Sequence, residues 1–209
     1  KIHSPLSGTV RSGNYVINYA GTGDTGDNML IMPSSTSMFI IADGTGIAPS
    51  IAIKTVGSDA GVLSDVSLLV RAMRKANEDI YRYGQKEGKI SGCKCTALLL
   101  KENSLNAAHV GDIRVYIINK NKIRQITDDH TPLGRMLKNR KITPEEARIS
   151  PRQNIAYRMV GTNPHLEIAL YQQKLTSGDT VLMCTRGIWI YVSDEEILKT
   201  VSNTGDIKS

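Results

Sequence analysis

Short apolar runs recur along most of this chain, and polar or glycine residues that favour turns separate them. Met38–Ala42 is an uninterrupted apolar run that stops at Asp43, and Val181–Cys184 is another, which is typical of buried strands. Asn119–Lys122 reads as a hairpin turn between two further runs. The pattern predicts strands at 38–42, 95–101, 105–110, 114–119, 123–126, 166–175 and 181–184, with a weak strand around 15–19.

Apolar residues at helical spacing mark fewer segments. Asp65–Tyr83 shows this spacing, with Asp65 as the expected N-cap. Other helices are expected within 47–56, from Thr143-Pro144, and from the capping box of Ser193 and Glu196. Thr185–Gly187 is expected to form a tight turn. Because strands and helices occur in separate clusters, the pattern favours an α+β sandwich over a doubly wound parallel sheet.

The composition is that of an ordinary globular domain. The chain has 209 residues, of which 40% are hydrophobic and 22% charged, so it is long enough to bury a sizeable core. No apolar run reaches the length of a membrane span, and Lys1–His3 does not open a signal peptide. We therefore expect a cytoplasmic protein without a membrane partner.

The net charge of +6 has its densest source between Arg135 and Arg148. Such a run could attract nucleic acid, acidic lipid or a phosphorylated partner, and it could equally be a solvated surface. The chain has one Phe and one Trp, which leaves little aromatic surface for stacking on bases. A nucleic-acid partner is therefore not expected.

The three cysteines do not have the spacing of a metal site. Cys93 and Cys95 are separated by one residue, so on a strand both thiols lie on the same face. A zinc site would need further ligands nearby. Together with Cys184 they are expected to be buried, reduced thiols.

Five colinear segments resemble the metal-dependent protein phosphatase 2C family. Ile40–Gly46 resembles its Val-Ala-Asp-Gly-Met-Gly-Gly, and Ala108–Tyr116 resembles its Ala-His-Val-Gly-Asp-Ser-Arg. Ile126–Thr131 resembles the Thr-x-Asp-His segment, and Ile142–Ile155 resembles the flap of bacterial members. Val181–Ile197 resembles the strand, turn and helix around Asp-Gly and Leu-Trp-Asp.

The resemblance implies a four-layer α-β-β-α sandwich, in which two antiparallel sheets are flanked by helices. We expect one domain over residues 1–209, with a flap insertion at about 132–158. The final elements of the family domain are expected to be missing from the chain.

The family's chemistry is metal-assisted hydrolysis of phosphoserine or phosphothreonine, for which two Mn²⁺ or Mg²⁺ ions activate a water. The resemblance places Asp43 at the aspartate that bridges the two metals and the Gly44 carbonyl at a backbone ligand. It also places Asp27 at the last residue of the family's Asn-Glu-Asp. These three residues form the candidate metal site.

Several other family positions carry a different residue here. Arg186 and Ile190 stand where two metal-binding aspartates are expected, and Thr22 stands where an arginine grips the substrate phosphate. Gly26 replaces an acidic residue, and Lys94 replaces the glycine of Gly-Thr-Thr. These departures surround one site and predict a catalytically degenerate member of the family.

We therefore expect a pseudophosphatase that acts as a regulatory or binding module for a protein partner, such as a phosphorylated one, and that needs no cofactor. The alternatives are an active Mn²⁺- or Mg²⁺-dependent serine/threonine phosphatase and a domain that regulates an attached kinase-like or sensor domain. In the inactive interpretation, the Arg186 guanidinium pairs with Asp43, Asp27 or both. In the active one, Arg186 turns to solvent and the acids bind one weak metal.

The remaining polar and aromatic residues are expected to be structural. Asp112 and Arg114 are expected to form a turn pair, and Asp129 with His130 a turn rather than a third metal site. His109 is expected in the core or at its rim. Trp189 and Tyr191 are expected to pack a helix onto the sheet.

Overall fold

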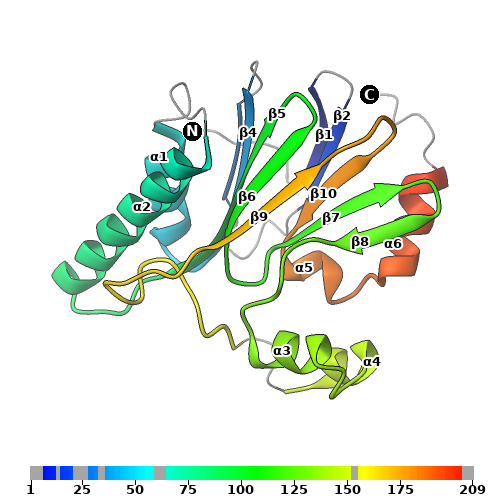
Figure 1. The fold of residues 1–209 in the computed structure, drawn as a ribbon. Helices are drawn as coiled ribbons and strands as arrows, with labels where there is room; N and C mark the ends of the chain where they lie inside the picture. The colour runs from blue at the N-terminus through cyan, green and yellow to red at the C-terminus, as the bar shows by residue number, and fades with distance from the viewer. Residues whose placement is uncertain are drawn as a thin grey trace.

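In the computed structural model, residues 36–58, 65–151 and 155–202 are described in full, and residues 7–12, 15–20, 28–32 and 203 by their backbone. Two five-stranded sheets form the centre of the molecule (Figure 1). One sheet has the order β1-β2-β10-β7-β8 and the other β3-β4-β5-β6-β9. The strands of the first are β1 (Ser7–Ser12), β2 (Tyr15–Ala20), β10 (Thr180–Cys184), β7 (Arg114–Asn119) and β8 (Lys122–Gln125). Those of the second are β3 (Asn28–Met32), β4 (Thr36–Gly44), β5 (Cys93–Lys101), β6 (Ser104–Val110) and β9 (Ala169–Lys174).

Nearly all neighbouring strands are antiparallel, as the sandwich prediction requires. The exception is the pair of β2 and β10, which is parallel and in which Val181 lies opposite Ile17. These two strands are far apart in the sequence, and only a long connection allows parallel neighbours. The prediction of two purely antiparallel sheets therefore needs this one correction.

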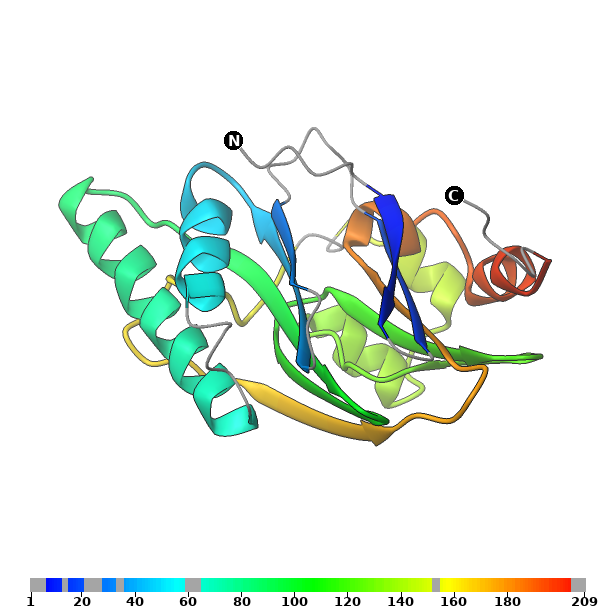
Figure 2. The same ribbon diagram turned by 90° about the horizontal axis from the view of Figure 1, so that it is seen from above.

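Helices cover the outer faces of the sandwich. The helices α1 (Ala48–Ser58) and α2 (Val66–Lys86) pack on the β3–β6 sheet, and α6 (Asp194–Asn203) contacts β8 of the other sheet. Seen from above, the order helix, sheet, sheet, helix is clear (Figure 2). The short helices α3 (Pro132–Lys138) and α4 (Pro144–Ile149) lie apart from both sheets and form what we call the flap (Figure 1). No helix in the described part of the chain has the length and apolarity needed to cross a membrane.

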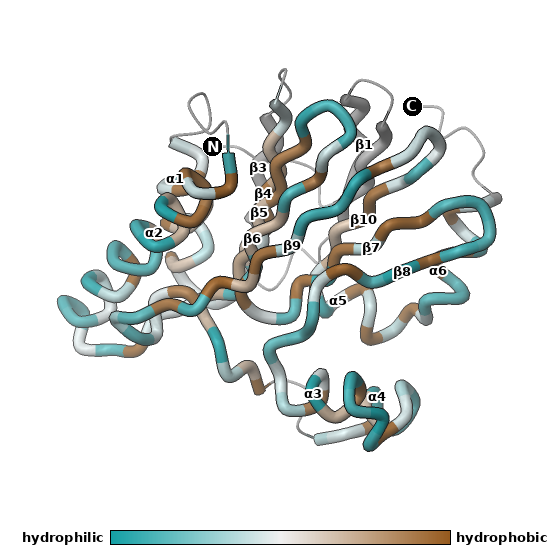
Figure 3. Tube along the Cα trace, viewed as in Figure 1, coloured by the Kyte–Doolittle hydropathy of each residue, from teal (hydrophilic) through white to brown (hydrophobic). Residues whose placement is uncertain are grey.

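The strand β4 is apolar throughout because both of its faces are covered. Met38 and Ile40 belong to the core under the helices, whereas Phe39 and Ile41 belong to the core between the sheets. Hydrophobic residues accordingly run in succession along the central strands (Figure 3). This double burial explains why the segment shows no alternation of apolar and polar residues.

All three cysteines are reduced and buried, as expected. Cys93 and Cys95 lie on the helix-facing side of β5, which confirms that they share one face. Burial raises the pKa of Cys95 to about 12, and that of Cys184 to about 12 as well. These thiols therefore stay protonated near neutral pH and have the character of small apolar side chains.

The predicted helix starts are confirmed by their capping bonds. Asp65 Oδ1 accepts hydrogen bonds from the backbone N–H groups of Ser67 and Leu68, at 2.7 and 3.1 Å. Thr143 forms a complete capping box with Glu146 at the start of α4. The expected turn at Thr185–Gly187 is wrong: Thr185 is the N-cap of a one-turn helix, α5, that spans Arg186–Trp189. The strand predicted at 166–175 starts too early, because β9 begins at Ala169.

His109 on β6 is fully buried, which confirms its predicted place in the core. Its Nε2 lies 3.1 Å from the Asp128 carbonyl oxygen, which can only accept, so Nε2 carries the proton. Its Nδ1 lies 2.7 Å from Thr96 Oγ1 and accepts the hydroxyl proton. Burial lowers the pKa of His109 to about 4.

We expect the protein to lose stability as the pH falls from about 6.5 towards 4, since the unfolded state takes up a proton on this residue before the folded state does. The shift corresponds to about 3 kcal/mol of unfolding free energy once both states are protonated. Urea unfolding at pH 7.5 and at pH 4.5 measures the loss. A His109→Gln variant, which cannot take up the proton, should show a distinctly smaller difference between the two pH values. An unchanged difference would contradict the assignment.

Candidate functional site

The candidate site lies where β4 ends and β5 begins, beside the turn between β6 and β7. Asp43, near the end of β4, is directly opposite Lys94 in the antiparallel pairing with β5. The next pair along the ladder is Gly44 with Cys93. A Cβ atom on Gly44 would lie 2.8 Å from Cys93 Cβ and 2.9 Å from its Cα, so the two backbones approach too closely for a side chain. The register and this close approach place Asp43 and Lys94 side by side.

The Lys94 ammonium lies between two carboxylates. Its Nζ is 3.0 Å from Asp43 Oδ2 and 2.9 Å from Asp112 Oδ1. The side chains of Lys94 and Asp43 are each 13% exposed and that of Asp112 is 1% exposed. Burial alone would lower the pKa of Lys94, but the carboxylates of Asp112 and Asp43 outweigh it and raise that pKa above its usual value. Lys94 is therefore a permanent cation at this site.

These contacts correct two expectations. Among the described residues, Lys94 and not Arg186 pairs with Asp43. The other expected partner of Arg186, Asp27, lies outside the described residues. Arg186 is half-buried at the first position of α5, and its guanidinium has no ion-pair partner in the described part of the chain. The expected pair of Asp112 with Arg114 is also wrong, because Lys94 lies within reach of Asp112 and a different acid faces Arg114.

Other candidate positions are distributed as follows. Gly44 lies at the end of β4 beside Asp43, and Ile190 is the C-cap of α5. Thr22, Gly26 and Asp27 lie outside the described residues. Within the described ranges, no group of three or more His, Cys, Asp or Glu side chains is arranged to hold a metal.

Arg114 forms a second buried ion pair, with Asp129. Its Nε and Nη2 donate to the two carboxylate oxygens at 3.1 and 2.8 Å, which is the bidentate geometry that arginine favours. The Arg114 guanidinium also stacks on the Trp189 ring, 3.7 Å from its centroid. Asp129 thus has a structural partner, as its expected turn role implies.

Trp189 connects this ion pair to the Lys94 site. Its Nε1–H donates to the Asp112 carbonyl oxygen at 3.0 Å. Trp189 therefore packs α5 against the sheet, as expected, whereas Tyr191 is 82% exposed and does not. Sequence reasoning missed Lys94 as the partner of both acids, because no local pattern reports which residue a distant strand brings opposite Asp43.

His130 fastens the base of the flap to the turn that carries Asp112. Its backbone N–H donates to the Gly111 carbonyl oxygen at 2.7 Å, and its Nδ1 accepts from the Gly111 N–H at 3.1 Å. The His130 carbonyl oxygen in turn accepts from the Tyr157 N–H at 3.0 Å. Both ends of the flap therefore meet at His130.

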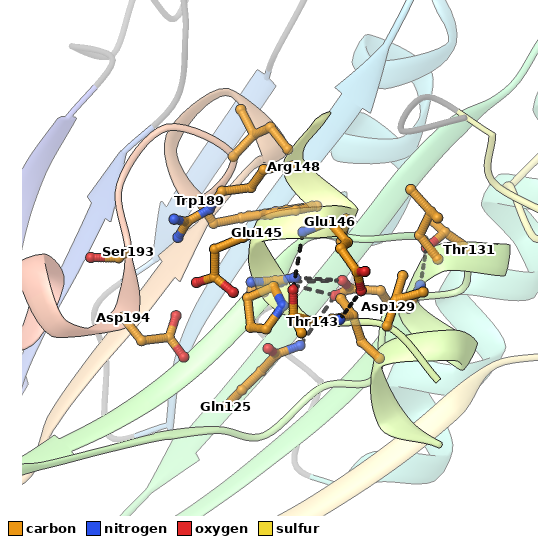
Figure 4. Close-up of a pocket in the computed structure, with 18 of the residues that line it drawn as sticks. Gln125, Asp129, Thr131, Thr143, Glu145, Glu146, Arg148, Trp189, Ser193 and Asp194 are labelled. Atoms are coloured by element: carbon orange, nitrogen blue, oxygen red, sulfur yellow. Dashed lines mark hydrogen bonds and ion pairs between the residues drawn. The ribbon is translucent and has the colours of Figure 1, made fainter. Parts of the chain in front are cut away.

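A cavity of about 800 Å³ lies between the flap and the sandwich (Figure 4). Arg114 and Trp189 line it, as do Glu145 of α4 and Asp194 of α6. Three cations of the basic run, Arg140, Lys141 and Arg148, also line it, whereas Lys138 pairs with Asp128 at 2.6 Å. Part of the basic run therefore faces a cavity and is not simply the solvated surface that was one of the expectations.

Comparison with known proteins agrees with this geometry. The protein phosphatase 2C family model matches residues 57–140. A serine/threonine phosphatase, stp, of Listeria monocytogenes is 29% identical over 190 residues, covering 80% of this chain and 75% of its own length. The crystal structure of the serine/threonine phosphatase Stp1 from Staphylococcus aureus superimposes with a TM-score of 0.80 at 26% identity, covering 96% of this chain and 83% of that one.

A third structure, the catalytic domain of the serine/threonine protein phosphatase PstP in complex with two manganese ions, has a TM-score of 0.71. It is 24% identical and covers 93% of this chain and 82% of its own, so it supports the fold alone. These neighbours share the α+β sandwich described above. In these comparisons the chain is similar to the protein phosphatase 2C family over residues 57–140, to serine/threonine phosphatases in sequence, and to them in fold.

Proposed function

We propose that this chain is a phosphatase 2C domain that binds phosphorylated protein partners as a regulatory module and does not turn over phosphate esters. The observation that carries the proposal is the Lys94 ammonium held between Asp43 and Asp112. The resemblance gives Asp43 the role of the bridging metal ligand, and here a cation of the protein itself occupies that carboxylate.

The charge of Lys94 would repel a metal ion that bridged at Asp43. A charge of +1 and a charge of +2 about 5 Å apart repel by about 7 kcal/mol at an effective dielectric constant of about 20. A metal at Asp43 would therefore have to displace the Lys94 ammonium and break both of its ion pairs. Arg186 and Ile190, at two other family ligand positions, supply no carboxylate to offset this cost.

The relatives favour a second candidate function. They are named as serine/threonine phosphatases, and one solved neighbour contains two manganese ions. An active Mn²⁺- or Mg²⁺-dependent hydrolase of phosphoserine and phosphothreonine is therefore the alternative. The expectation that no cofactor is required stays a proposal, and the experiments below separate the two functions.

The flap offers a reason to expect an anionic partner. Arg140 and Lys141 are exposed at the turn between α3 and α4 and line the cavity beside the sandwich. In the described part of the chain, neither side chain has a hydrogen-bond or ion-pair partner. Two free cations at a cavity attract phosphate groups, which carry up to two negative charges.

Hydrolysis of p-nitrophenyl phosphate in Mn²⁺ tests the absence of turnover. We expect the wild-type rate to equal that of an Asp43→Ala variant, because the carboxylate that would bridge the metals is already occupied. The Staphylococcus aureus relative serves as the positive control. A wild-type rate well above background that Asp43→Ala abolishes would establish the active alternative.

Binding of a fluorescent phosphoserine peptide tests the regulatory function. We expect the phosphorylated peptide to bind at least about tenfold more tightly than its unphosphorylated form, since charge-assisted bonds are worth about 1.5–3 kcal/mol. The double variant Arg140→Glu, Lys141→Glu should lose this preference. Lys86→Glu, an exposed charge reversal at the end of α2, is the matched control and should keep it. Equal affinity for both peptides would contradict the proposal.

A further inference from the structure

The Asp43–Lys94–Asp112 cluster joins three separate segments of the chain. Asp43 lies near the end of β4, Lys94 lies at the start of β5, and Asp112 lies in the turn between β6 and β7. One ammonium group contacts both carboxylates, at 3.0 and 2.9 Å. A side chain that holds two carboxylates from different segments acts as a cross-link between them.

The backbone is shaped to accommodate the Lys94 side chain. Gly111, with φ of +114°, leaves open the space that the Lys94 stem fills, because a Cβ atom there would lie 2.5 Å from Lys94 Cβ. Its N–H and carbonyl groups are both bonded to His130. Gly111 is therefore held in place by the flap base while it makes room for the lysine.

The charges of the cluster show what Lys94 contributes. Two carboxylates and one ammonium leave a single net negative charge among side chains that are at most 13% exposed. Without the ammonium, two negative charges would face each other with little solvent, which is strongly unfavourable. A divalent cation is the other species that would neutralise them, and carboxylate oxygens are its preferred ligands.

The position of Asp112 also affects the residues beyond it. The Asp112 carbonyl oxygen accepts the Trp189 Nε1–H, and Trp189 stacks on Arg114, the partner of Asp129. A turn that moved away from Lys94 would therefore disturb the packing of α5. By holding Asp112 in place, Lys94 therefore also supports the packing of α5.

We propose that Lys94 is a built-in structural substitute for a metal ion, which makes the fold independent of divalent cations, and that removing its charge uncovers a divalent-cation site at Asp43 and Asp112. This inference rests on the proposed function in one respect, namely that the native site is not a metal centre. It goes further in assigning the ammonium a structural role and in naming the cation class that would replace it.

Thermal unfolding in EDTA and in millimolar Mn²⁺ tests the proposal. The wild type should unfold at the same temperature in both. Lys94→Met, which keeps the length of the stem and removes the charge, should unfold about 5–10 °C lower in EDTA and recover most of this loss in Mn²⁺. Lys138→Met removes a lysine from the exposed pair with Asp128 and is the matched control, for which we expect little change in either condition.

Calorimetric titration of Mn²⁺ provides the second measurement. We expect binding to Lys94→Met and none to the wild type or to the double variant Lys94→Met, Asp112→Asn, which lacks one carboxylate. Should Lys94→Met be unfolded in EDTA, folding on addition of Mn²⁺ gives the same answer. The proposal is overturned if Mn²⁺ stabilises the wild type by several degrees, or if it fails to stabilise Lys94→Met.

The two proposals fail in different ways. A wild type without hydrolysis whose Lys94→Met variant gains nothing from Mn²⁺ removes only the structural role of Lys94. A wild type that prefers no phosphopeptide removes the regulatory function and leaves the metal-independent fold intact. Hydrolysis by the wild type in Mn²⁺, together with stabilisation by the ion, removes both.

Discussion

The contact between one ammonium and two carboxylates is the constraint around which this site is arranged. Asp43 and Asp112 come from segments that no regular hydrogen-bond ladder joins directly, and Lys94 holds them at 3.0 and 2.9 Å. Because these groups are almost completely removed from solvent, their mutual attraction is only weakly screened. The same burial makes it energetically unfavourable to leave any one of these charges without a partner of opposite charge. The space at Gly111 accommodates the Lys94 side chain.

A second buried ion pair, between Arg114 and Asp129, lies at the cavity beside the flap. Arg114 binds Asp129 with both arms of its guanidinium, and Trp189 lies against it while bonding to the Asp112 backbone. In both clusters a buried acid is paired with a basic side chain of the chain itself. The cavity between the flap and the sandwich is lined by three further cations, Arg140, Lys141 and Arg148.

The secondary structure was largely predictable, and the site was predictable only in part. Asp65 and Thr143 cap their helices through bonds to residues two or three positions away, which local sequence reports directly. The run at Met38–Ala42 identified a buried strand because both of its faces are apolar. A basic side chain paired with Asp43 was also predicted, but it was assigned to Arg186, whereas Lys94 makes this contact. Lys94 was recognised as a departure from the family pattern, but its ion pairs with Asp43 and Asp112 were not predicted.

Sequence alone determined most of the elements, the α+β class, the reduced cysteines and the unusual residues around Asp43, since each depends on local spacing or on composition. It did not predict the strands at 7–12 and 28–32 or the helix at 132–138. Only the tertiary structure decided which basic residue meets which acid. The pairing of β4 with β5 joins residues about fifty positions apart and sets Lys94 opposite Asp43. The β6–β7 turn then brings Asp112 to the same ammonium, while Arg114 reaches Asp129. Electrostatic partners depend on distance and burial, and both are properties of the folded chain.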